Sequence, residues 1–366
     1  MKRDHSLILE AGFRSESNRS LFCISVRSAF DLYLRSRRWS RGDECIFVGL
    51  NVPDMFRIAE SYGLRVIGSD IDAITTKLDI SQLRASINED TRFIVVPHLF
   101  GHRFDLSPVI ELAKSLKLDV VEDCAQAFAG HDWSGSEGAT LSLFSFGPLK
   151  TATALQGAVA IVRDSSLREA MDRELQSYTV QPTWRYAARV VRFAMMTIAT
   201  QRFVYGLFVG LLRSLGVDHE AVIHTATQSS TSKSFARWLR TQPCTALKQV
   251  IRRQIVESEP SFQTRIAKGS ALFDAIGESV PLVLRGQQPN VFWMVPILTE
   301  APETLKDLLR DEGFDAMSSR LVAVRESGGE GAKALEYAAM LPFSPQMSEM
   351  EFQRLGSIVT RFFSRE

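Results

Sequence analysis

The sequence lacks the signatures of several common protein classes. Its four cysteines are widely spaced and include no C-x-x-C pair, which argues against a zinc site or a disulfide framework. No G-x-G-x-x-G follows an expected strand, and no serine lies in a G-x-S-x-G elbow. The 43 Lys and Arg residues against 42 Asp and Glu give no overall charge that would attract nucleic acid or an anionic membrane. The first residues also lack the apolar run of a secretory signal, so we expect a soluble protein of the reducing cytoplasm.

The composition is that of a globular protein with more than one domain. The chain has 366 residues, of which 45% are hydrophobic and 23% charged, and can therefore bury a substantial core. From about Arg27 to Val162, short apolar runs alternate with amphipathic runs, a pattern typical of a mainly parallel sheet covered by helices. We expect strands at Glu44–Val48, Leu64–Gly68, Arg92–Pro97, Leu118–Val121, Leu141–Ser145 and Ala158–Val162. The helices expected between them are Ser28–Arg37, Pro53–Tyr62, Ile80–Ile87 and Leu106–Lys117.

The second half of the chain has a different pattern. Helical periodicity dominates from Ser166 to about Ile276. Strands near Val291–Leu298 and Phe343 then alternate with helices at Pro302–Glu312 and Ser348–Phe363. We therefore expect a large α/β domain over residues 1–240, with an atypical helical insertion at about 178–240, and a small C-terminal α+β domain over residues 241–366.

One apolar stretch, Phe193–Leu212, carries a single charged residue among twenty. Its length approaches that of a membrane span. We favour a buried or subunit-interface helix, and a helix that lies on a membrane surface is the second alternative. A true span is the least favoured, because Arg202 and Gln201 near its centre are costly in lipid.

The segment Leu118–Phe128 (LDVVEDCAQAF) places acidic residues where an apolar strand ends. In an open α/β sheet, ligands bind beyond the carboxyl ends of the strands, so Asp123 is a candidate site residue. The alternative is that Asp123 only caps a following helix. Cys124 is expected to be a small buried thiol rather than a nucleophile. His98 and His102 are expected in a structural turn, because no third ligand accompanies them, and we expect no metal.

A second segment, Ser142–Val162, places a lysine between two apolar strands. Lys150 follows a Gly-Pro turn and is bounded by small residues. Burial lowers the pKa of an ammonium group, which turns a lysine into an imine-forming nucleophile. The alternative is a loop lysine whose ammonium group caps carbonyl oxygens.

Together the two segments meet the requirements of pyridoxal 5'-phosphate (PLP). This cofactor needs an imine-forming lysine, an acid beside its pyridine nitrogen, and donors for its phosphate. Asp123 precedes Lys150 by 27 residues, and the two lie at the ends of different strands. The segment Ile24–Ala29 opens a helix whose N-terminus favours an anion, and Ser145 adds a hydroxyl donor. We therefore expect Lys150 to bind PLP.

These segments also resemble a known family. Val95–Gly130 contains an Asp-x-x-Gln motif, and Ser142–Val162 contains a Ser-Phe-x-x-x-Lys motif. With Arg35–Asp72 upstream and Leu341–Leu355 near the end, they are similar to the DegT/DnrJ/StrS family of PLP-dependent sugar aminotransferases, which has fold type I. The resemblance implies a mainly parallel seven-stranded sheet in the large domain and a smaller α+β domain. It is weak from about 178 to 287.

The resemblance implies a role for each motif residue. Lys150 would hold PLP as an imine and move a proton between the cofactor and the substrate, while Asp123 would pair with the pyridine nitrogen. Gln126 would lie against the ring or its phenolic oxygen. The phosphate would be bound by Ser145 and by the backbone of Arg27 and Ser28. Glutamate would donate the amino group to a nucleotide-linked keto sugar, in the biosynthesis of surface polysaccharides or secondary metabolites.

The sequence departs from the family pattern at several positions. Asn51 stands where the family has an aromatic residue that stacks on the ring, and Arg27-Ser28 replaces Gly-Thr. The family's N-Y-R-M segment, which completes the phosphate site of a neighbouring subunit, is not recognisable, and Arg240 is its best counterpart. A homodimer is expected because fold type I sites usually form between subunits. Two other functions stay open, a PLP-binding regulatory protein and a PLP-dependent sugar dehydratase, although Lys150 argues against the dehydratase, whose relatives have His there.

Overall fold

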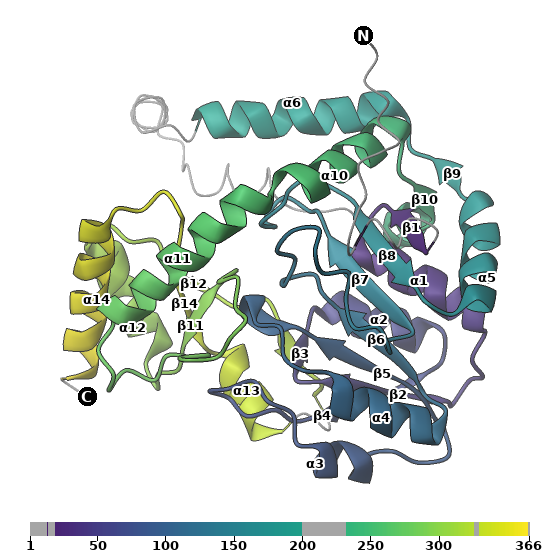
Figure 1. Ribbon diagram of the computed structural model, residues 1–366, viewed down its shortest axis with the longest axis horizontal. Coiled ribbons are helices and arrows are strands. Elements are labelled where there is room, and N and C mark those ends of the chain that lie inside the picture. Colours follow the sequence, from purple (N-terminus) through teal and green to yellow (C-terminus); the bar gives the residue numbers. More distant parts are fainter. Residues whose placement is uncertain (1–12, 14–18, 200–231, 326–328, 365–366) are drawn as a thin grey trace.

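The computed structural model describes residues 13, 19–199, 232–325 and 329–364 (Figure 1). Among these residues, seven strands form the main sheet, in the order β1-β8-β7-β6-β5-β2-β4. The sheet is parallel except for β8, which runs antiparallel to both of its neighbours. The predicted mainly parallel seven-stranded sheet is therefore confirmed. Its strands are β1 (Ser20–Cys23), β2 (Glu44–Val48), β4 (Arg65–Ser69), β5 (Thr91–Pro97), β6 (Asp119–Asp123), β7 (Leu141–Ser145) and β8 (Ala158–Val162).

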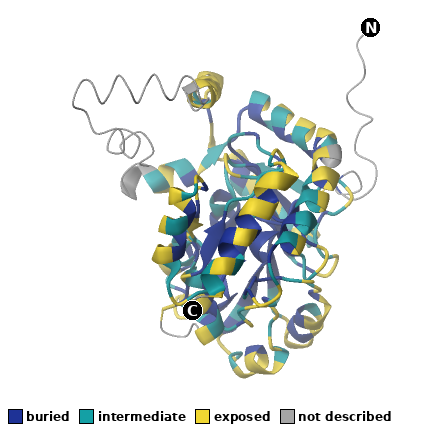
Figure 2. Cartoon of the chain, turned by 90° about the vertical axis from the view of Figure 1, so that its left-hand side faces the viewer, coloured by how far each residue is buried: buried dark blue, intermediate teal, exposed yellow. Residues whose placement is uncertain are grey.

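The alternation of side chains along the strands produces three layers. On β5, Phe93 and Val95 belong to the hydrophobic cluster on one face, and Ile94 and Val96 belong to the cluster on the other. Both faces are apolar because helices cover both of them. Figure 2 shows the buried strands in the middle of the molecule and, around them, helices whose outer sides are exposed. One face packs against α1 (Val26–Arg37), α2 (Pro53–Ser61) and α5 (Ser165–Gln176), and the other against α3 (Ile80–Ala85), α4 (Ser107–Leu116) and α13 (Glu330–Glu336).

Parallel strands bring their carboxyl ends to one edge of the sheet. The strand expected at Leu118–Val121 extends two residues further, so that Asp123 is the last residue of β6 and pairs with Pro97 of β5. A turn follows Asp123 instead of a helix, so the alternative of a helix cap is wrong. Ser145 ends the neighbouring strand β7, and Lys150 follows in the connection to β8.

The small domain is built on a three-stranded antiparallel sheet. Its strands are β11 (Val295–Ile297), β14 (Ala339–Leu341) and β12 (Met317–Ser318), and it packs with α12 (Pro302–Asp311), α14 (Glu349–Phe363) and the second half of α11 (Glu259–Ala275). The preceding helix, α10 (Thr245–Glu257), packs on the large domain through Leu247, Ile251 and Ile255. The change from one hydrophobic cluster to the other thus falls within α11, and the domain boundary at 240/241 stays a prediction. A short pair, β3 (Leu50–Asn51) with β13 (Val322–Ala323), connects the two parts of the chain.

The expected helical insertion contains two described helices, α6 (Thr183–Ala199) and α9 (Ser232–Leu239), flanked by the parallel pair β9 (Thr179–Val180) and β10 (Thr241–Gln242). The apolar stretch 193–212 enters α6 only at 193–199, and its remainder lies outside the described residues. Met195 and Ile198 are 65% and 61% exposed, so this part is not buried within its own chain. The other half of the prediction, a helix at a subunit interface, stays a prediction. Of the helices described, none combines the length and the hydropathy needed to cross a membrane.

Candidate active site

Asp123 lies nearly buried at the carboxyl edge of the main sheet. Its Oδ1 accepts a hydrogen bond from the backbone N–H of Ala125 at 3.0 Å. Burial raises the pKa of Asp123 above its usual value, and the Ala125 N–H, the charge of Lys150 and the amide of Asn51 oppose this effect. The carboxylate is therefore fixed in orientation and has little solvent around it.

Asn51 is the second partner of this carboxylate, and sequence reasoning missed it. Its Nδ2 donates to Asp123 Oδ2 at 3.2 Å, while its own Oδ1 accepts from the N–H of Val52 at 2.8 Å. Asn51 is 3% exposed and lies on β3, where it pairs with Val322 of β13. The only indication in the sequence was that Asn51 stands where the DegT/DnrJ/StrS family has an aromatic residue. That departure gave no indication of contact with an acid 72 residues away.

Lys150 lies in the long connection between β7 and β8, close enough to Asp123 for their charges to interact. Burial lowers the pKa of Lys150 to about 8, Asp123 raises it, and the charge of Arg27 lowers it. The Nζ atom lies 4.2 Å from the centroid of the Trp293 ring. The predicted juxtaposition of a lysine of lowered pKa with a buried acid is thus present, and Arg27 lies close enough to Lys150 for their charges to repel.

Hydrogen bonds from both domains fix the loop that carries Lys150. Within the loop, the N–H of Lys150 donates to the carbonyl oxygen of Gly147 at 3.2 Å, and the Thr153 hydroxyl donates to the same oxygen at 2.8 Å. From the small domain side, Trp293 Nε1 donates to the carbonyl oxygen of Leu149 at 2.8 Å. Trp293 therefore contacts both the backbone before Lys150 and the ammonium group itself.

A cavity of about 660 Å³ opens beside Lys150 between the large and the small domain. Its volume is in the range of small-molecule sites. Arg265 of α11 lines it, and burial lowers the pKa of its guanidinium to about 10. This guanidinium donates to the carbonyl oxygens of Val291, Phe292 and Trp293, at 3.0, 2.6 and 3.2 Å, and so fixes the backbone at Trp293. Neither Trp293 nor Arg265 was predicted from the sequence.

Gln126 and Ser145 lie at the same carboxyl edge of the sheet as Asp123, because Gln126 follows β6 and Ser145 ends the parallel neighbour β7. Gln126 is 9% exposed, and its Oε1 accepts from the N–H of Phe100 at 2.7 Å. Phe100 has a φ of 58°, so Gln126 supports a strained turn. Ser145 Oγ accepts from the N–H of Gly147 at 3.5 Å, which leaves its hydroxyl hydrogen for another acceptor.

The start of α1 lies beside the Lys150 loop, because the N–H of Gly157 donates to the carbonyl oxygen of Ile24 at 3.1 Å. The Ser25 side chain caps this helix by accepting from the N–H of Ser28. The side chains of the two predicted phosphate residues point elsewhere. Arg27 pairs with Asp54 and lies over the rings of Phe235 and Trp238 in α9, and the Ser28 hydroxyl donates to the carbonyl of Leu239.

Arg240 contacts α1 through Asp31 and lies away from the Lys150 cavity of its own chain. Its Nε lies 3.5 Å from Asp31 Oδ2, and the Tyr62 hydroxyl donates to Asp31 Oδ1 at 2.8 Å. The cavity beside Lys150 does not include Arg240 among its lining residues. Its predicted role toward a neighbouring subunit stays a prediction.

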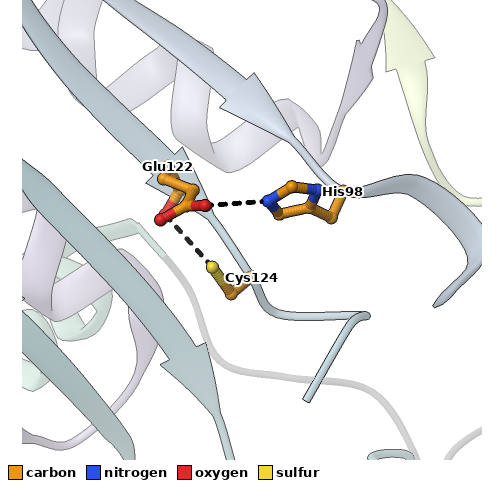
Figure 3. Close-up of side chains that lie close together, drawn as sticks. All are labelled: His98, Glu122 and Cys124. Carbon is orange, nitrogen blue, oxygen red and sulfur yellow. Dashed lines mark hydrogen bonds and ion pairs between the residues drawn. The ribbon is translucent and has the colours of Figure 1, made fainter. Parts of the chain in front are cut away.

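A buried cluster of three potential metal ligands, His98, Glu122 and Cys124, lies next to this site (Figure 3). Their ligand atoms lie within 4.8 Å of one another. Burial would raise the pKa of Glu122, but hydrogen bonds from His98, Ser142 and Ser136 lower it to about 2. Burial raises the pKa of the Cys124 thiol well above its usual value, so the thiol stays protonated. These contacts favour a hydrogen-bonded core network over a metal site.

Comparison with known proteins defines the class of this fold and then the family. The structure resembles DesV of S. venezuelae in complex with a ketimine intermediate, with a TM-score of 0.67 and 18% identity over 95% of this chain and 85% of that one. It also resembles NtdA of Bacillus subtilis with bound cofactor PMP, with a TM-score of 0.65 and 15% identity over 93% of this chain and 73% of that one. The fold is thus that of the fold type I aminotransferases. Residues 9–199 match the DegT/DnrJ/EryC1/StrS aminotransferase family, and the chain belongs to this family.

Among curated relatives, the GDP-perosamine synthase of Escherichia coli O157:H7 is 33% identical over 164 residues, which cover 42% of this chain and 43% of that protein. The chain thus spans less than half the length of this relative. Residues 9–199, which match the family, contain the main sheet and the Lys150 loop but not the small domain that closes the cavity.

The lowered pKa of Lys150 gives a direct prediction. A lysine with a pKa of about 8 becomes neutral, and therefore nucleophilic, as the pH rises through 8. Competitive acetylation with mass spectrometry, in the absence of added cofactor, should give half-maximal reactivity of Lys150 near pH 8, with exposed Lys114 as the internal reference. The charge of Asp123 raises this pKa, so Asp123→Asn should move the midpoint to lower pH. A midpoint of about 10 or higher would match an ordinary exposed lysine and contradict the placement.

Proposed function

We propose that this protein is a PLP-dependent aminotransferase that moves an amino group from glutamate to a keto sugar attached to a nucleotide. The observation that carries the proposal is the pairing of Lys150 with Asp123 beside a cavity of about 660 Å³. Membership of an aminotransferase family supports it, and so do relatives whose names are those of aminotransferases of UDP-linked and dTDP-linked sugars. The site would serve the biosynthesis of surface polysaccharides or secondary metabolites.

The residues present fit this cofactor. PLP withdraws electrons from the carbon that carries the amino group, provided that its pyridine nitrogen stays protonated. A buried carboxylate held by two donors is suited to that nitrogen, and this role is assigned to Asp123. The N-terminus of α1, with the backbone N–H groups of Arg27 and Ser28, is suited to the phosphate, together with the Ser145 hydroxyl. Gln126 uses its oxygen on Phe100, so its amide nitrogen is the group available to the ring's phenolic oxygen.

Lys150 has two tasks in this assignment. Its amine binds the carbonyl carbon of the cofactor, which requires the neutral form that burial favours. The same Nζ atom would be the group that moves a proton between the substrate carbon and the cofactor's C4' position. Trp293, 4.2 Å from Nζ, excludes water on the cavity side during this transfer.

Several finer features belong to the same proposal. The acceptor would enter the cavity between the domains, where Asp315, Ser344 and Gln346 are among the lining residues and offer polar groups to a sugar. A homodimer in the cytoplasm is the expected assembly, with Arg240 approaching the phosphate site of the neighbouring subunit. Within one chain, Arg240 is held by Asp31, so such an approach would need this pair to open or to lie at the subunit boundary.

The first experiment follows the cofactor's absorption. Protein loaded with PLP should absorb at about 420 nm, and this absorption band should be lost in Lys150→Ala. Adding glutamate should shift the absorption toward that of the pyridoxamine form, with release of 2-oxoglutarate. A band that forms but does not respond to any amino donor would favour the PLP-binding regulatory alternative and contradict an aminotransferase.

Asn51 provides a second test, because it is the donor that holds Asp123. Asn51→Leu should weaken PLP binding by about tenfold or more, since a hydrogen bond to a charged group contributes about 1.5–3 kcal/mol. The dissociation constant is measured by titrating PLP into the protein and following absorbance. Asn88→Leu is the matched control, because Asn88 donates to Glu44 at 2.7 Å at the opposite edge of the sheet. Equal effects of the two substitutions on the dissociation constant would show that Asn51 has no specific role toward Asp123.

A further inference from the structure

Helix α6 presents an apolar stripe to solvent. Trp184, Val191, Met195 and Ile198 are 67%, 57%, 65% and 61% exposed. Their spacing of seven, four and three residues places them on one side of the helix. The other side holds the helix to the protein, because Tyr186 is buried and its hydroxyl donates to the carbonyl oxygen of Ala154 at 3.1 Å. Figure 1 shows α6 along the edge of the molecule, next to α10.

Basic residues accompany this stripe. Arg185 and Arg192 are exposed on the same helix, seven residues apart and therefore on one flank of the stripe. The sequence contains no acidic residue from 175 to 217. Over the longer segment 175–256 it has eleven Lys and Arg against two acidic residues, although the whole chain has a formal net charge of only +1. Positive charge is thus concentrated in the part of the chain that contains α6.

Two partners could cover an apolar stripe flanked by arginines, namely a second copy of this chain or a lipid surface, and the arginines favour one of them. In an antiparallel two-fold contact between copies of this chain, the same helix would face itself, and the flank that carries its arginines would lie on the same side as that of the partner. Such a contact opposes like charges. An anionic lipid surface accepts both features, because the acyl region takes the apolar side chains and the headgroups neutralise the arginines. Trp184 at the start of the helix is also of the type that favours the membrane interface.

We propose that the outward face of α6, formed by Trp184, Val191, Met195 and Ile198 with Arg185 and Arg192, binds the surface of an anionic membrane. The helix lies in the interface plane and does not cross the bilayer. This binding is independent of the amino transfer, because α6 contributes no residue to the cavity beside Lys150.

The test uses the full chain loaded with PLP and two kinds of vesicle, one of phosphatidylcholine with phosphatidylglycerol and one of phosphatidylcholine alone. Co-sedimentation should occur with the anionic vesicles and decrease as the salt concentration rises. The triple variant Val191→Gln, Met195→Gln, Ile198→Gln should lower the partition coefficient by about tenfold or more. Removing the two charges with Arg185→Gln and Arg192→Gln should lower it by about 30-fold, since each arginine near the surface contributes about one kcal/mol.

Matched controls distinguish binding through this face from nonspecific binding through other exposed residues. Leu116→Gln, Tyr337→Ser and Met350→Gln replace exposed apolar residues elsewhere, and Arg310→Gln with Arg361→Gln replaces exposed arginines of the small domain. These controls should bind vesicles like the wild type. Each variant is checked for an unchanged circular dichroism spectrum and PLP affinity, so a misfolded variant is recognised as such.

Three outcomes would overturn the proposal. The first is absence of binding to anionic vesicles by the wild type. The second is equal loss in the α6 variants and in the controls. The third is a change from dimer to monomer in the α6 variants, seen by light scattering, with vesicle binding unchanged, which would assign the face to a second copy of this chain.

Discussion

The site depends on the charge interaction between Lys150 and Asp123 at the edge of the main sheet. Burial alone disfavours the charged form of each group, raising the pKa of the acid and lowering that of the lysine. Each charge partly offsets the cost of burying the other. The balance leaves an amine with a pKa of about 8 beside an acid, and this is the combination that a carbonyl cofactor with a basic ring nitrogen requires.

The remainder of the fold keeps these two groups in place. The three-layer core fixes the ends of β6 and β7, and hence the position of Asp123 and the start of the Lys150 loop. The small domain contributes from the other side, because β13 pairs with β3, which carries Asn51, and Trp293 holds the loop at Leu149. A buried guanidinium, Arg265, fixes Trp293 in turn. A movement of the small domain would therefore change the positions of both Asp123 and Lys150.

The parts of the site that the sequence predicts are those fixed by local chain geometry. Asp123 and Lys150 follow apolar strands, and parallel strands bring such ends together, so their proximity follows from the pattern. The Asn51 contact and the Trp293 contact connect residues 72 and 144 positions apart, and only tertiary packing decides them. The backbone of Arg27 and Ser28 was expected near a phosphate, and this stays a prediction. The contacts of their side chains with Trp238 and with the carbonyl oxygen of Leu239 join residues far apart in the sequence, so no local pattern indicates them. Hydropathy likewise identified the apolar part of α6 but not the direction in which it faces, which depends on what Tyr186 packs against.

The central claim is that Lys150 is the residue that binds the cofactor. It is tested most directly by loading the protein with PLP, reducing it with borohydride and locating the modified lysine by peptide mass spectrometry. The account predicts a single phosphopyridoxyl group, located on the peptide that contains Lys150. Modification of a different lysine, or no stable modification at all, would contradict the account.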